Sequence, residues 1–405
     1  MSKEINKIVL AYSGGLDTSV IIKWLQDEYQ AEIIAMVGDV GQQEDLDAIK
    51  EKALTTGATR AYVEDLKEDY AYNYVLPTLQ AQALYEGKYP LVSSLSRPII
   101  SRQMVKIARK ENADALAHGC TGKGNDQVRF DTCCRSLTPE MKIIAPLREW
   151  EFGSRDEEFD YAVKNGIPVE VSKKNPYSID KNLWGRCIEC GILEDPWQEP
   201  PADVFQMTTD PMDAPSEPEY LEIGFMEGVP VSINGEEMGL VELIDNLNFL
   251  AGRHGIGRVD MIENRVVGIK SREIYEVPAA TVLYMAHRHL EDMVLDRQTS
   301  HFKEHISSNY ATLAYDGLWF SPLKEAMDAF IGSIQQYVEG VIRIKMYRGQ
   351  ATVVGRKSNR TLYQYQLATY EPEDAFNHQS AEGFIDLFSL PSRVFSEVNG
   401  NGELL

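Results

Sequence analysis

The sequence predicts an α/β protein whose parallel sheet carries helices on both faces, followed by a second, α+β domain and a helical C-terminal tail. Two observations lead to this prediction. From Lys7 to Ala145, short apolar runs alternate with amphipathic stretches of helical period, which is typical of a parallel sheet between two helical layers. Beyond Pro218, the pattern changes to hairpins and longer helices. The expected strands of the first sheet are residues 7–11, 32–40, 61–63, 113–118 and 142–145.

Two of the expected helices lie between these strands. Residues 46–57 have helical periodicity and end at Gly57, a residue type that commonly caps a helix C-terminus. Residues 97–112 form the second helix and end at Asn112. Ligands of open parallel sheets bind beyond the carboxyl ends of the strands, near the point where the strand order reverses. The segments that follow the strands are therefore the first place to look for a site.

The remainder of the chain divides into a connection, a second domain and a tail. Residues 175–218 are rich in Pro, Asp and Trp without a clear period, which predicts a long irregular connection. The tail has an amphipathic helical pattern over 381–398 without a Lys/Arg cluster, which favours docking on a subunit or domain over a membrane. The second domain is expected to contain strands 220–225 and 229–233, helices 240–254, 278–296 and 321–337, and a hairpin of 340–347 with 351–356.

Composition limits the classes of function. The chain has 405 residues and a formal charge of -22, so nonspecific attraction to a nucleic acid is unfavourable unless a local basic patch overrides it. No apolar run approaches the length of a membrane span, and no signal sequence precedes the first strand. Five cysteines, an odd number, indicate free thiols in a reducing compartment. We therefore expect a cytoplasmic protein that acts on small molecules.

The most informative segment follows the first expected strand. Its two glycines allow close approach of the backbone to a ligand, and the N–H groups of the helix that follows can face an anion. A plain glycine turn does not require the hydroxyls and the Asp that surround these glycines. The segment is neither a Walker A loop nor G-x-G-x-x-G; it resembles the pyrophosphate loop of ATP pyrophosphatases, which implies an adenine nucleotide alpha hydrolase-like sheet. Its residues are Ala11, Tyr12, Ser13, Gly14, Gly15, Leu16, Asp17, Thr18 and Ser19.

A second polar segment, residues 118–130, follows the strand expected at 113–118 and should emerge at the same edge of the sheet. It combines three glycines with Thr, Lys, Asn, Asp and Arg, a set that can hold anions and ammonium groups together. By spacing alone, a solvated loop with ordinary turn chemistry remains an alternative, because G-x-x-G-K is only a fragment of a P-loop.

Together these segments resemble the argininosuccinate synthase family. The resemblance rests on AYSGGLDTS at 11–19, SLSRP at 94–98, GCTGKGNDQVRF at 119–130, KNPYS at 174–178 and ENR at 263–265. It extends in order over about two thirds of the chain. It implies the reaction of citrulline, aspartate and ATP to argininosuccinate, AMP and pyrophosphate in arginine biosynthesis, with Mg²⁺ accompanying the nucleotide. It also implies a homo-oligomer, a tetramer in this family.

The resemblance assigns residues to each substrate. For ATP it implies residues 11–19 with Gly38 and Gly119. For aspartate it implies Thr121, Asn125 and Asp126. For citrulline it implies Tyr89, Ser94, Asn125, Arg129, Ser178, Cys187, Glu263 and Tyr275. A zwitterionic substrate needs a cationic and an anionic partner, and Arg129 and Glu263 are of those types. No catalytic general base and no protein metal site is assigned.

The expected domains are a nucleotide-binding ATP pyrophosphatase domain at 1–170, a synthetase domain for citrulline and aspartate at 171–370, and an oligomerisation tail at 371–405. Two rivals share parts of this pattern. A tRNA thiolase would use the same loop and a Cys pair, but should carry a basic RNA surface. A noncatalytic ATP sensor would not need the second polar segment.

Two further patterns have alternatives. Cys187 stands where the family usually has Ser, and a thiol is a weaker hydrogen-bond donor. Cys187 and Cys190 form C-x-x-C, but no second pair at ligand spacing accompanies them, so we expect neither a zinc site nor a redox pair. His287, His289, His301 and His305 lie close in sequence, but H-F-K-E-H is not H-E-x-x-H, so we expect these histidines on solvated helix faces.

Overall fold

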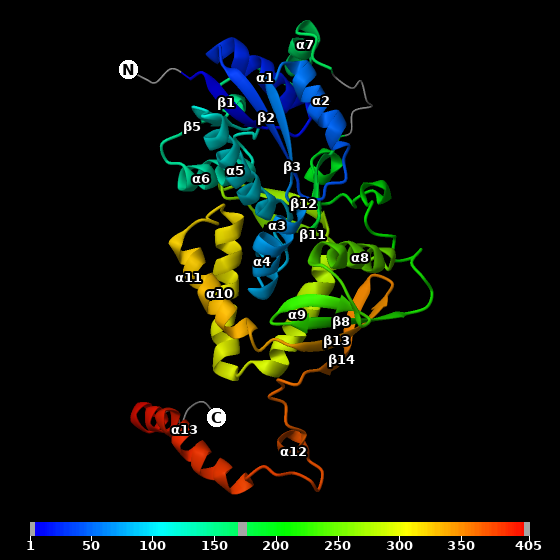
Figure 1. Cartoon of the computed structure of the whole chain (residues 1–405). Coiled ribbons are helices and arrows are strands. Elements are labelled where there is room, and N and C mark those ends of the chain that lie inside the picture. The colour runs from blue at the N-terminus through cyan, green and yellow to red at the C-terminus, as the bar shows by residue number, and fades with distance from the viewer. Residues whose placement is uncertain (1–4, 169–175, 401–405) are drawn as a thin grey trace. The chain divides into compact units, whose positions relative to one another are not determined.

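The computed structural model describes residues 5–168 and 176–400 (Figure 1). Contacts between residues divide the chain into two units, residues 1–360 and 361–405. The domain borders expected near residues 170 and 370 stay predictions. Lys174 and Asn175 of the KNPYS motif lie outside the described residues.

The first sheet has five parallel strands in the order β3-β2-β1-β4-β5, as the alternating pattern predicted. Its central strand shows why these runs are apolar throughout. Ile8 and Leu10 pack with the residues of one face, whereas Val9 packs with those of the other. All three are fully buried because helices cover both faces. The strands are β1 (Lys7–Ala11), β2 (Glu32–Asp39), β3 (Arg60–Asp65), β4 (Ala115–Ala117) and β5 (Lys142–Ile144).

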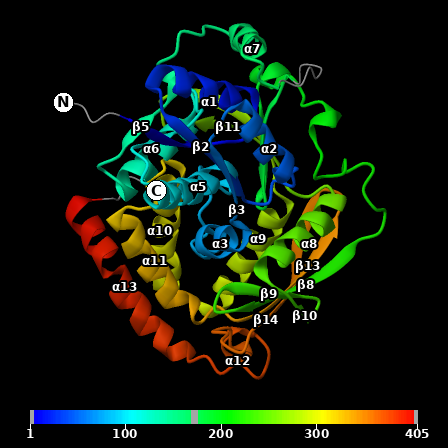
Figure 2. The same cartoon turned by 45° about the horizontal axis from the view of Figure 1, so that its top comes forward.

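Helices of opposite faces come from different parts of the sequence. On one face, Ile21, Ile22 and Leu25 of α1 pack against the sheet, and α2 lies beside α1 (Figure 2). On the other face, Met104 and Ile107 belong to α5, which packs against α6. The helices are α1 (Leu16–Tyr29), α2 (Leu46–Thr56), α5 (Val92–Glu111), α6 (Asn125–Leu137) and α7 (Arg155–Lys164).

The strand order reverses between β1 and β4. From β1 the chain adds β2 and β3 on one side of the sheet, then returns to place β4 and β5 on the other. The segments that follow β1 and β4 therefore leave the sheet at its topological switch point, where open α/β sheets bind ligands. Both segments were predicted to carry the site.

One helix begins earlier than predicted. The helix expected at 97–112 starts at Val92 and contains Pro98 in its second turn. A proline is typical of a first turn, because it lacks the N–H that an interior position needs. Here the preceding turn has an additional hydrogen bond, because the buried Ser96 Oγ donates to the carbonyl oxygen of Ser93 at 2.9 Å. The predicted end at Asn112 is confirmed, with a left-handed cap (φ 53°).

The prediction of an irregular connection was wrong for residues 178–189. These residues form the antiparallel strands β6 (Ser178–Asn182) and β7 (Gly185–Glu189). They belong to a four-stranded sheet in the order β11-β12-β7-β6, with β11 (Arg258–Asn264) and β12 (Lys270–Glu276). The partner strand β12 follows β7 only after a long intervening segment, so no local pattern could show the pairing. Two 3₁₀ turns follow, at Gly191–Glu194 and Ala202–Val204.

A third sheet supports the second half of the first unit. It is antiparallel, in the order β10-β9-β8-β13-β14, and its hairpin of β13 and β14 was predicted. Its strands are β8 (Glu219–Met226), β9 (Val229–Ile233), β10 (Glu236–Glu237), β13 (Gly340–Tyr347) and β14 (Gln350–Lys357). The accompanying helices are α3 (Lys67–Tyr70), α4 (Leu76–Gln80), α8 (Leu240–Arg253), α9 (Pro278–Val294), α10 (Arg297–Tyr315) and α11 (Pro322–Gln335), with a π-helical turn at Ala71–Val75 between α3 and α4.

The four clustered histidines have different surroundings. His301 and His305 are exposed on α10, as expected. His287 is fully buried, so the expectation of a solvated face was wrong for this residue. Its ring nitrogens lie 2.8 Å from Gln335 Oε1 and 3.0 Å from Gln82 Nε2, and these two bonds satisfy the imidazole inside the core.

The second unit contains α12 (Tyr365–Ala368) and α13 (His378–Asn399), the latter confirming the predicted tail helix. Its apolar residues are exposed in this single chain, including Phe384, Phe388 and Phe395. Among the described residues, no helix has the length and apolar character to cross a membrane.

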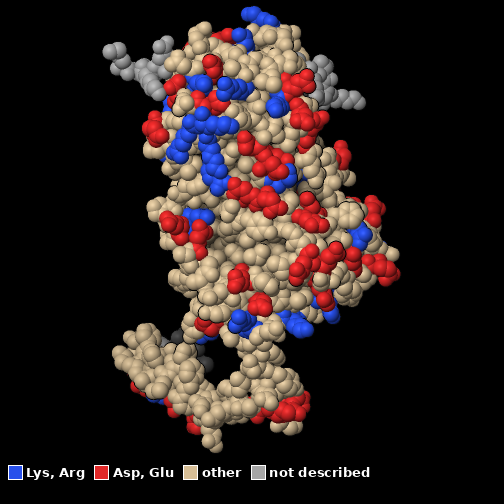
Figure 3. Space-filling model, in the orientation of Figure 1, with Lys and Arg blue, Asp and Glu red and all other residues tan. Residues whose placement is uncertain are grey.

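Charge is unevenly distributed over the first unit. On the face in Figure 3, Lys and Arg side chains gather near α5, whose exposed basic residues are Lys106, Arg109 and Lys110. Acidic side chains are spread over much of the rest of that face.

Candidate functional site

A cavity of ≈ 670 Å³ lies at the carboxyl ends of β1 and β4. One wall consists of the segments that follow these two strands together with α5 and α6. The opposite wall is the four-stranded sheet β11-β12-β7-β6. The cavity therefore joins the two halves of the first unit, each of which supplies polar side chains to it.

The segment after β1 forms a tight turn into α1. Gly14 has a positive φ of 78°, which glycine adopts without steric cost. Ser13 Oγ lies 3.1 Å from Thr18 Oγ1, and Tyr12 OH lies 2.9 Å from Ser19 Oγ, so the hydroxyls brace the turn. Gly15 caps α1 without a side-chain hydrogen bond. The N–H groups of the first turn thus remain available for an anion.

A cation approaches this turn from another helix. Lys52 of α2 donates from Nζ to the carbonyl oxygen of Gly14, at 2.6 Å. The segment itself contains no Lys or Arg, unlike a Walker A loop. Positive charge near the turn therefore comes from outside the motif.

The segment after β4 packs closely against the first. A Cβ atom on Gly119 would lie 3.0 Å from Thr18 Cγ2 and from Ile21 Cδ1, so glycine permits this approach. His118 is buried, lies 2.9 Å from Asp131 Oδ1 through Nε2, and accepts from the Cys120 N–H through Nδ1 at 3.3 Å. Burial opposes ionisation of Asp131, but His118 and Arg148 outweigh it and lower the pKa of Asp131 to about 2.

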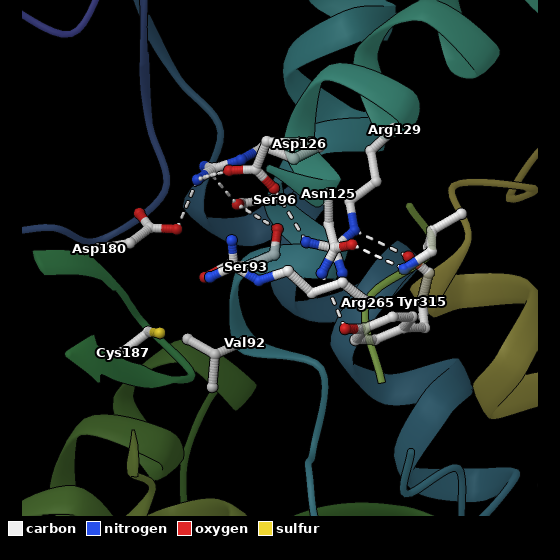
Figure 4. Close-up of polar contacts among 12 residues, drawn as sticks. Val92, Ser93, Ser96, Asn125, Asp126, Arg129, Asp180, Cys187, Arg265 and Tyr315 are labelled. Atoms are coloured by element: carbon white, nitrogen blue, oxygen red, sulfur yellow. Dashed lines mark hydrogen bonds and ion pairs between the residues drawn. The ribbon is translucent and has the colours of Figure 1, made fainter. Parts of the chain in front are cut away.

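Two arginines converge on Asp126 at the start of α6 (Figure 4). Arg97 Nη2 donates to Asp126 Oδ2 at 2.7 Å and to Asp180 Oδ2 at 2.6 Å. Arg129 Nη1 donates to the other oxygen of Asp126 at 2.9 Å. Desolvation raises the pKa of Asp126, but the two guanidinium groups outweigh it and hold this pKa at about 2. Asp126 is therefore an ionised carboxylate between two cations.

Asn125, beside Asp126, connects α6 to the opposite wall. Its Nδ2 donates to Tyr315 OH at 2.8 Å, and its Oδ1 accepts from the Val266 N–H at 2.9 Å (Figure 4). Tyr315 OH in turn donates to Glu263 Oε1 at 2.8 Å, and Tyr275 OH donates to Glu263 Oε2 at 2.9 Å. Burial raises the pKa of Glu263 despite these bonds. Each Glu263 oxygen thus already accepts one phenolic hydrogen bond.

Strand alternation explains the composition of the sheet wall. Successive side chains of a strand point to opposite faces, so residues two apart share a face. The pairing register places Asp180 opposite Cys187, and Cys187 opposite Tyr275. Glu263 is opposite Ser271, two residues before Glu273. The residues of this face that line the cavity are Ser178, Asp180, Cys187, Glu189, Glu263, Glu273 and Tyr275.

Arg265 is the cation of this wall nearest to its glutamates. It donates from Nη2 to Glu273 Oε1 at 2.8 Å and also to Glu189. Ser271 Oγ donates to the same Glu273 oxygen at 2.8 Å, and the Cys187 thiol lies 3.5 Å from the other, Oε2. Burial, with repulsion from Glu189 and Glu263, raises the pKa of Glu273 to about 8.

Family comparisons agree with this geometry. The model described as the arginosuccinate synthase N-terminal HUP domain matches residues 7–168, and the one described as the arginosuccinate synthase C-terminal domain matches residues 177–395. The chain belongs to the argininosuccinate synthase family.

Curated relatives named argininosuccinate synthase match almost the full chain. The one from Symbiobacterium thermophilum is 56% identical over 393 residues, covering 97% of this chain and 98% of the relative. The one from Oceanobacillus iheyensis is 57% identical over 400 residues, covering 99% and 95%. The one from Brevibacillus brevis is 56% identical over 394 residues, covering 97% and 94%.

Most residues that the family resemblance implies line the cavity. These are Ala11, Tyr12, Ser13, Thr18, Gly38, Tyr89, Gly119, Thr121, Asn125, Asp126, Arg129, Ser178, Cys187, Glu263 and Tyr275. Gly14, Gly15, Leu16, Asp17 and Ser19 belong to the same turn but not to the lining. Ser94 is fully buried in α5, and its neighbour Ser93 lines the cavity instead.

Family motifs contained other site residues to which sequence reasoning gave no role. Arg97 and Arg265 stand inside quoted motifs, and their charge in a glycine- and hydroxyl-rich setting was a usable signal. Asp180 lies two residues after Ser178 in the same strand, and this alternation of polar residues was a second usable signal. Tyr315 had no such signal, because it contacts Asn125 across 190 residues of sequence.

Proposed function

We propose that this chain is an argininosuccinate synthase, a ligase that joins citrulline to aspartate with the cleavage of ATP to AMP and pyrophosphate through a citrullyl-AMP intermediate. The observation that supports it most is the shared cavity. A pyrophosphate-type turn opens into the same space as a wall of carboxylates, phenols and arginines, so a nucleotide and a zwitterion can meet there. Two relatives that are 56% and 57% identical to this chain are named argininosuccinate synthase.

The chemistry requires activation of citrulline. Its ureido carbon is a poor electrophile because resonance with both nitrogens resists attack by an amine. Transfer of AMP to the ureido oxygen converts that oxygen into a good leaving group. Attack by the ureido oxygen on the α phosphorus expels pyrophosphate, and the aspartate amine then displaces AMP. Positioning and charge stabilisation do most of this work.

ATP lies, in this proposal, along the turn at 11–19, with Gly38 and Gly119 against its adenosine. The free N–H groups at the start of α1 and the Lys52 ammonium face its phosphates. Mg²⁺ arrives with the nucleotide, since this ion is held largely by phosphates and water in such sites. When bound, it would supply positive charge to the departing pyrophosphate.

The two amino acids occupy the rest of the cavity. Citrulline lies along the sheet wall between Tyr89, Arg129, Ser178, Cys187, Glu263 and Tyr275, with Ser94 supporting it from behind. Aspartate lies near Thr121, Asn125 and Asp126, so Asn125 is shared. Tyr89 stacks on Tyr275 with ring centroids 4.2 Å apart, and this pair gives the citrulline side chain a flat apolar surface. The phosphate of AMP or solvent takes the proton of the aspartate amine.

Pyrophosphate release tests the proposal. With ATP and each partner added separately, release should require citrulline, and product should require aspartate as well. Ser13→Ala, which removes a hydroxyl of the turn, should weaken this release, whereas Ser136→Ala on the exposed side of α6 should not. Pyrophosphate release that depends on RNA, or that occurs equally without citrulline, would contradict the proposal.

We also propose a cytoplasmic homo-oligomer, a tetramer by analogy with the family. The support is α13, whose apolar residues Phe384, Ile385, Phe388 and Leu390 are exposed in the single chain. Deletion of residues 382–405 should lower the number of chains per particle in analytical ultracentrifugation. An unchanged number of chains would mean that the tail is not the assembly element.

A further inference from the structure

Two buried glutamates of adjacent strands face the cavity, and their oxygens differ in what they already accept. Glu263 on β11 and Glu273 on β12 are each 3% exposed. Both oxygens of Glu263 accept from phenolic hydroxyls, of Tyr315 and Tyr275. In Glu273, Oε1 accepts from Arg265 and Ser271, whereas the partner of Oε2 among the described residues is the Cys187 thiol, at 3.5 Å. A thiol is a weak donor.

The negative charge of Glu273 is also not fully balanced by a neighbouring cation. Arg265 is the cation bonded to it, and the same Nη2 also bonds Glu189. Glu263, the third glutamate of this wall, receives its bonds from neutral phenols. Within the described residues, Glu189 and Glu273 therefore share the Arg265 guanidinium, whereas the charge nearest to Glu263 on the helical side is Arg129. A buried carboxylate without a full counter-charge is costly, and a ligand cation placed beside it relieves that cost.

We infer that Glu273, through Oε2, binds the α-ammonium group of the amino acid that lies on this sheet, and that Glu263 mainly orients the two phenols. The inference rests on the proposed function, under which that amino acid is citrulline. It changes the anionic partner expected from the sequence, which was Glu263. The raised pKa of Glu273 is consistent with a site that awaits a cation.

This assignment makes Glu273 a residue that determines substrate specificity. Citrulline and 5-ureidopentanoate share the ureido group and the carboxylate, but only citrulline has the α-ammonium group. An enzyme that binds this ammonium through a buried carboxylate should therefore prefer citrulline strongly. The preference should disappear when the carboxylate becomes a neutral amide.

The test compares both substrates by pyrophosphate release in the full-length protein. Glu273→Gln should reduce the ratio of kcat/KM for citrulline to that for 5-ureidopentanoate on the order of 10- to 100-fold. The loss should lie in KM, with kcat at saturating citrulline largely kept. Glu273→Asp should restore part of the preference. Asp260→Asn, which breaks an ion pair with Arg272 on the opposite face of the sheet, serves as the matched control.

Three results would overturn the inference. One is an unchanged ratio in Glu273→Gln, and another is a collapse of the ratio in Glu263→Gln but not in Glu273→Gln. The third is equal proton release when the two ligands bind to the unmodified protein, a measurement that does not depend on the folding of a variant. Citrulline binding at pH 7, measured calorimetrically in buffers of different ionisation enthalpy, should release protons as Glu273 ionises, and 5-ureidopentanoate should release fewer.

Groups that face Glu273 and titrate or carry charge are Glu189 and Cys187 on β7, Glu263 on β11, Tyr275 on β12, and Arg265. Only the α-ammonium group distinguishes the two ligands. Equal proton release would therefore contradict the binding of that group by Glu273. If the unmodified protein released no pyrophosphate with citrulline at all, the proposed function would fail, which is a different outcome from an unchanged ratio.

Discussion

Asp126 and Glu273 are carboxylates on opposite walls of one cavity, and their surroundings set opposite properties. Asp126 lies between Arg97 and Arg129, which outweigh its desolvation and lower its pKa to about 2. Glu273 is buried among other glutamates and shares Arg265, and its pKa is raised to about 8. On the helical wall, two guanidinium groups therefore surround one carboxylate. On the sheet wall, two glutamates share Arg265, and under our inference a ligand ammonium group supplies the further positive charge.

The type of secondary structure explains this difference. On α6, Arg129 follows Asp126 by three residues and so lies one helical turn away, while Arg97 comes from the neighbouring α5. On the sheet, alternation places Glu189, Glu263 and Glu273 on one face. A helix thus pairs opposite charges over a short distance. The sheet gathers like charges from β7 and from the hairpin of β11 and β12, which is far from β7 in sequence.

The largest effect is expected from removing the cation that Asp126 shares with Asp180. Arg97→Gln leaves both carboxylates without this partner; because these ion pairs are partly buried, the loss of stability should lie between about 1 kcal/mol for an exposed pair and about 3–5 kcal/mol for a buried one. Chemical denaturation and steady-state kinetics would detect losses of stability and of activity together. Arg102→Gln, on the same helix but paired with Asp69, is the control. Equal losses of stability and activity in the two variants would mean that the effect is not specific to the ion pairs of Arg97.

Asp126→Ala should damage the aspartate step more than citrulline adenylation. The variant removes the ionised carboxylate of the proposed aspartate site, and loss of such a hydrogen bond costs about 2–4 kcal/mol. Single-turnover pyrophosphate release with citrulline alone reports the first step. Product formation with varied aspartate reports the second. Comparable losses in both measurements would refute a role confined to aspartate.

Stability against pH should separate the two carboxylates. The folded pKa of Glu273 lies above its ordinary value of 4.5, so its contribution is present at low pH and is lost as pH rises towards about 8. For Asp126, whose folded pKa is depressed, the contribution is lost as pH falls towards about 2. Glu273→Gln should therefore flatten the decline of unfolding free energy between pH 5 and 9.

The change expected for Glu273→Gln is on the order of 1 to 3 kcal/mol, since one pKa unit corresponds to about 1.4 kcal/mol. Denaturant titrations at several pH values would measure it. A variant whose stability falls with pH as steeply as that of the unmodified protein would show that Glu273 does not titrate in this range.

Cys187→Ser should have the smallest effect. A hydroxyl is a shorter and stronger donor than the thiol that now lies 3.5 Å from Glu273 Oε2, so the change makes Glu273 slightly more like Asp126. We expect the KM for citrulline to change by less than about threefold, since a neutral hydrogen bond contributes about 1 kcal/mol or less. Loss of bound zinc in both Cys187→Ser and Cys190→Ser would instead support a metal role.

The parts of the molecule that follow from local sequence were predictable. The buried run Ile8-Val9-Leu10 marks a strand covered on both faces, and the glycines and hydroxyls at 13–19 mark the tight turn into α1. The amphipathic pattern of the tail gave α13. In each case neighbours in the chain create the signal.

The sheet wall was less predictable, because its signal is spread over distant strands. Ser178 and Cys187 were expected in the site, and both lie there, but the strands that carry them were not expected. Their residues are mostly polar or charged, a composition typical of a solvated connection, and only the pairing of β7 with β12 shows them to be part of a sheet. The partnership of Tyr315 with Asn125 and Glu263 likewise depends on tertiary contact alone.

The fate of the ureido oxygen shows whether citrulline and ATP react with each other through that oxygen. Citrulline labelled with ¹⁸O at that oxygen is converted with ATP and aspartate, and the AMP formed is weighed by mass spectrometry. AMP should carry the label, because the labelled oxygen attacks phosphorus and leaves with AMP. Unlabelled AMP from a turnover that yields argininosuccinate would contradict it.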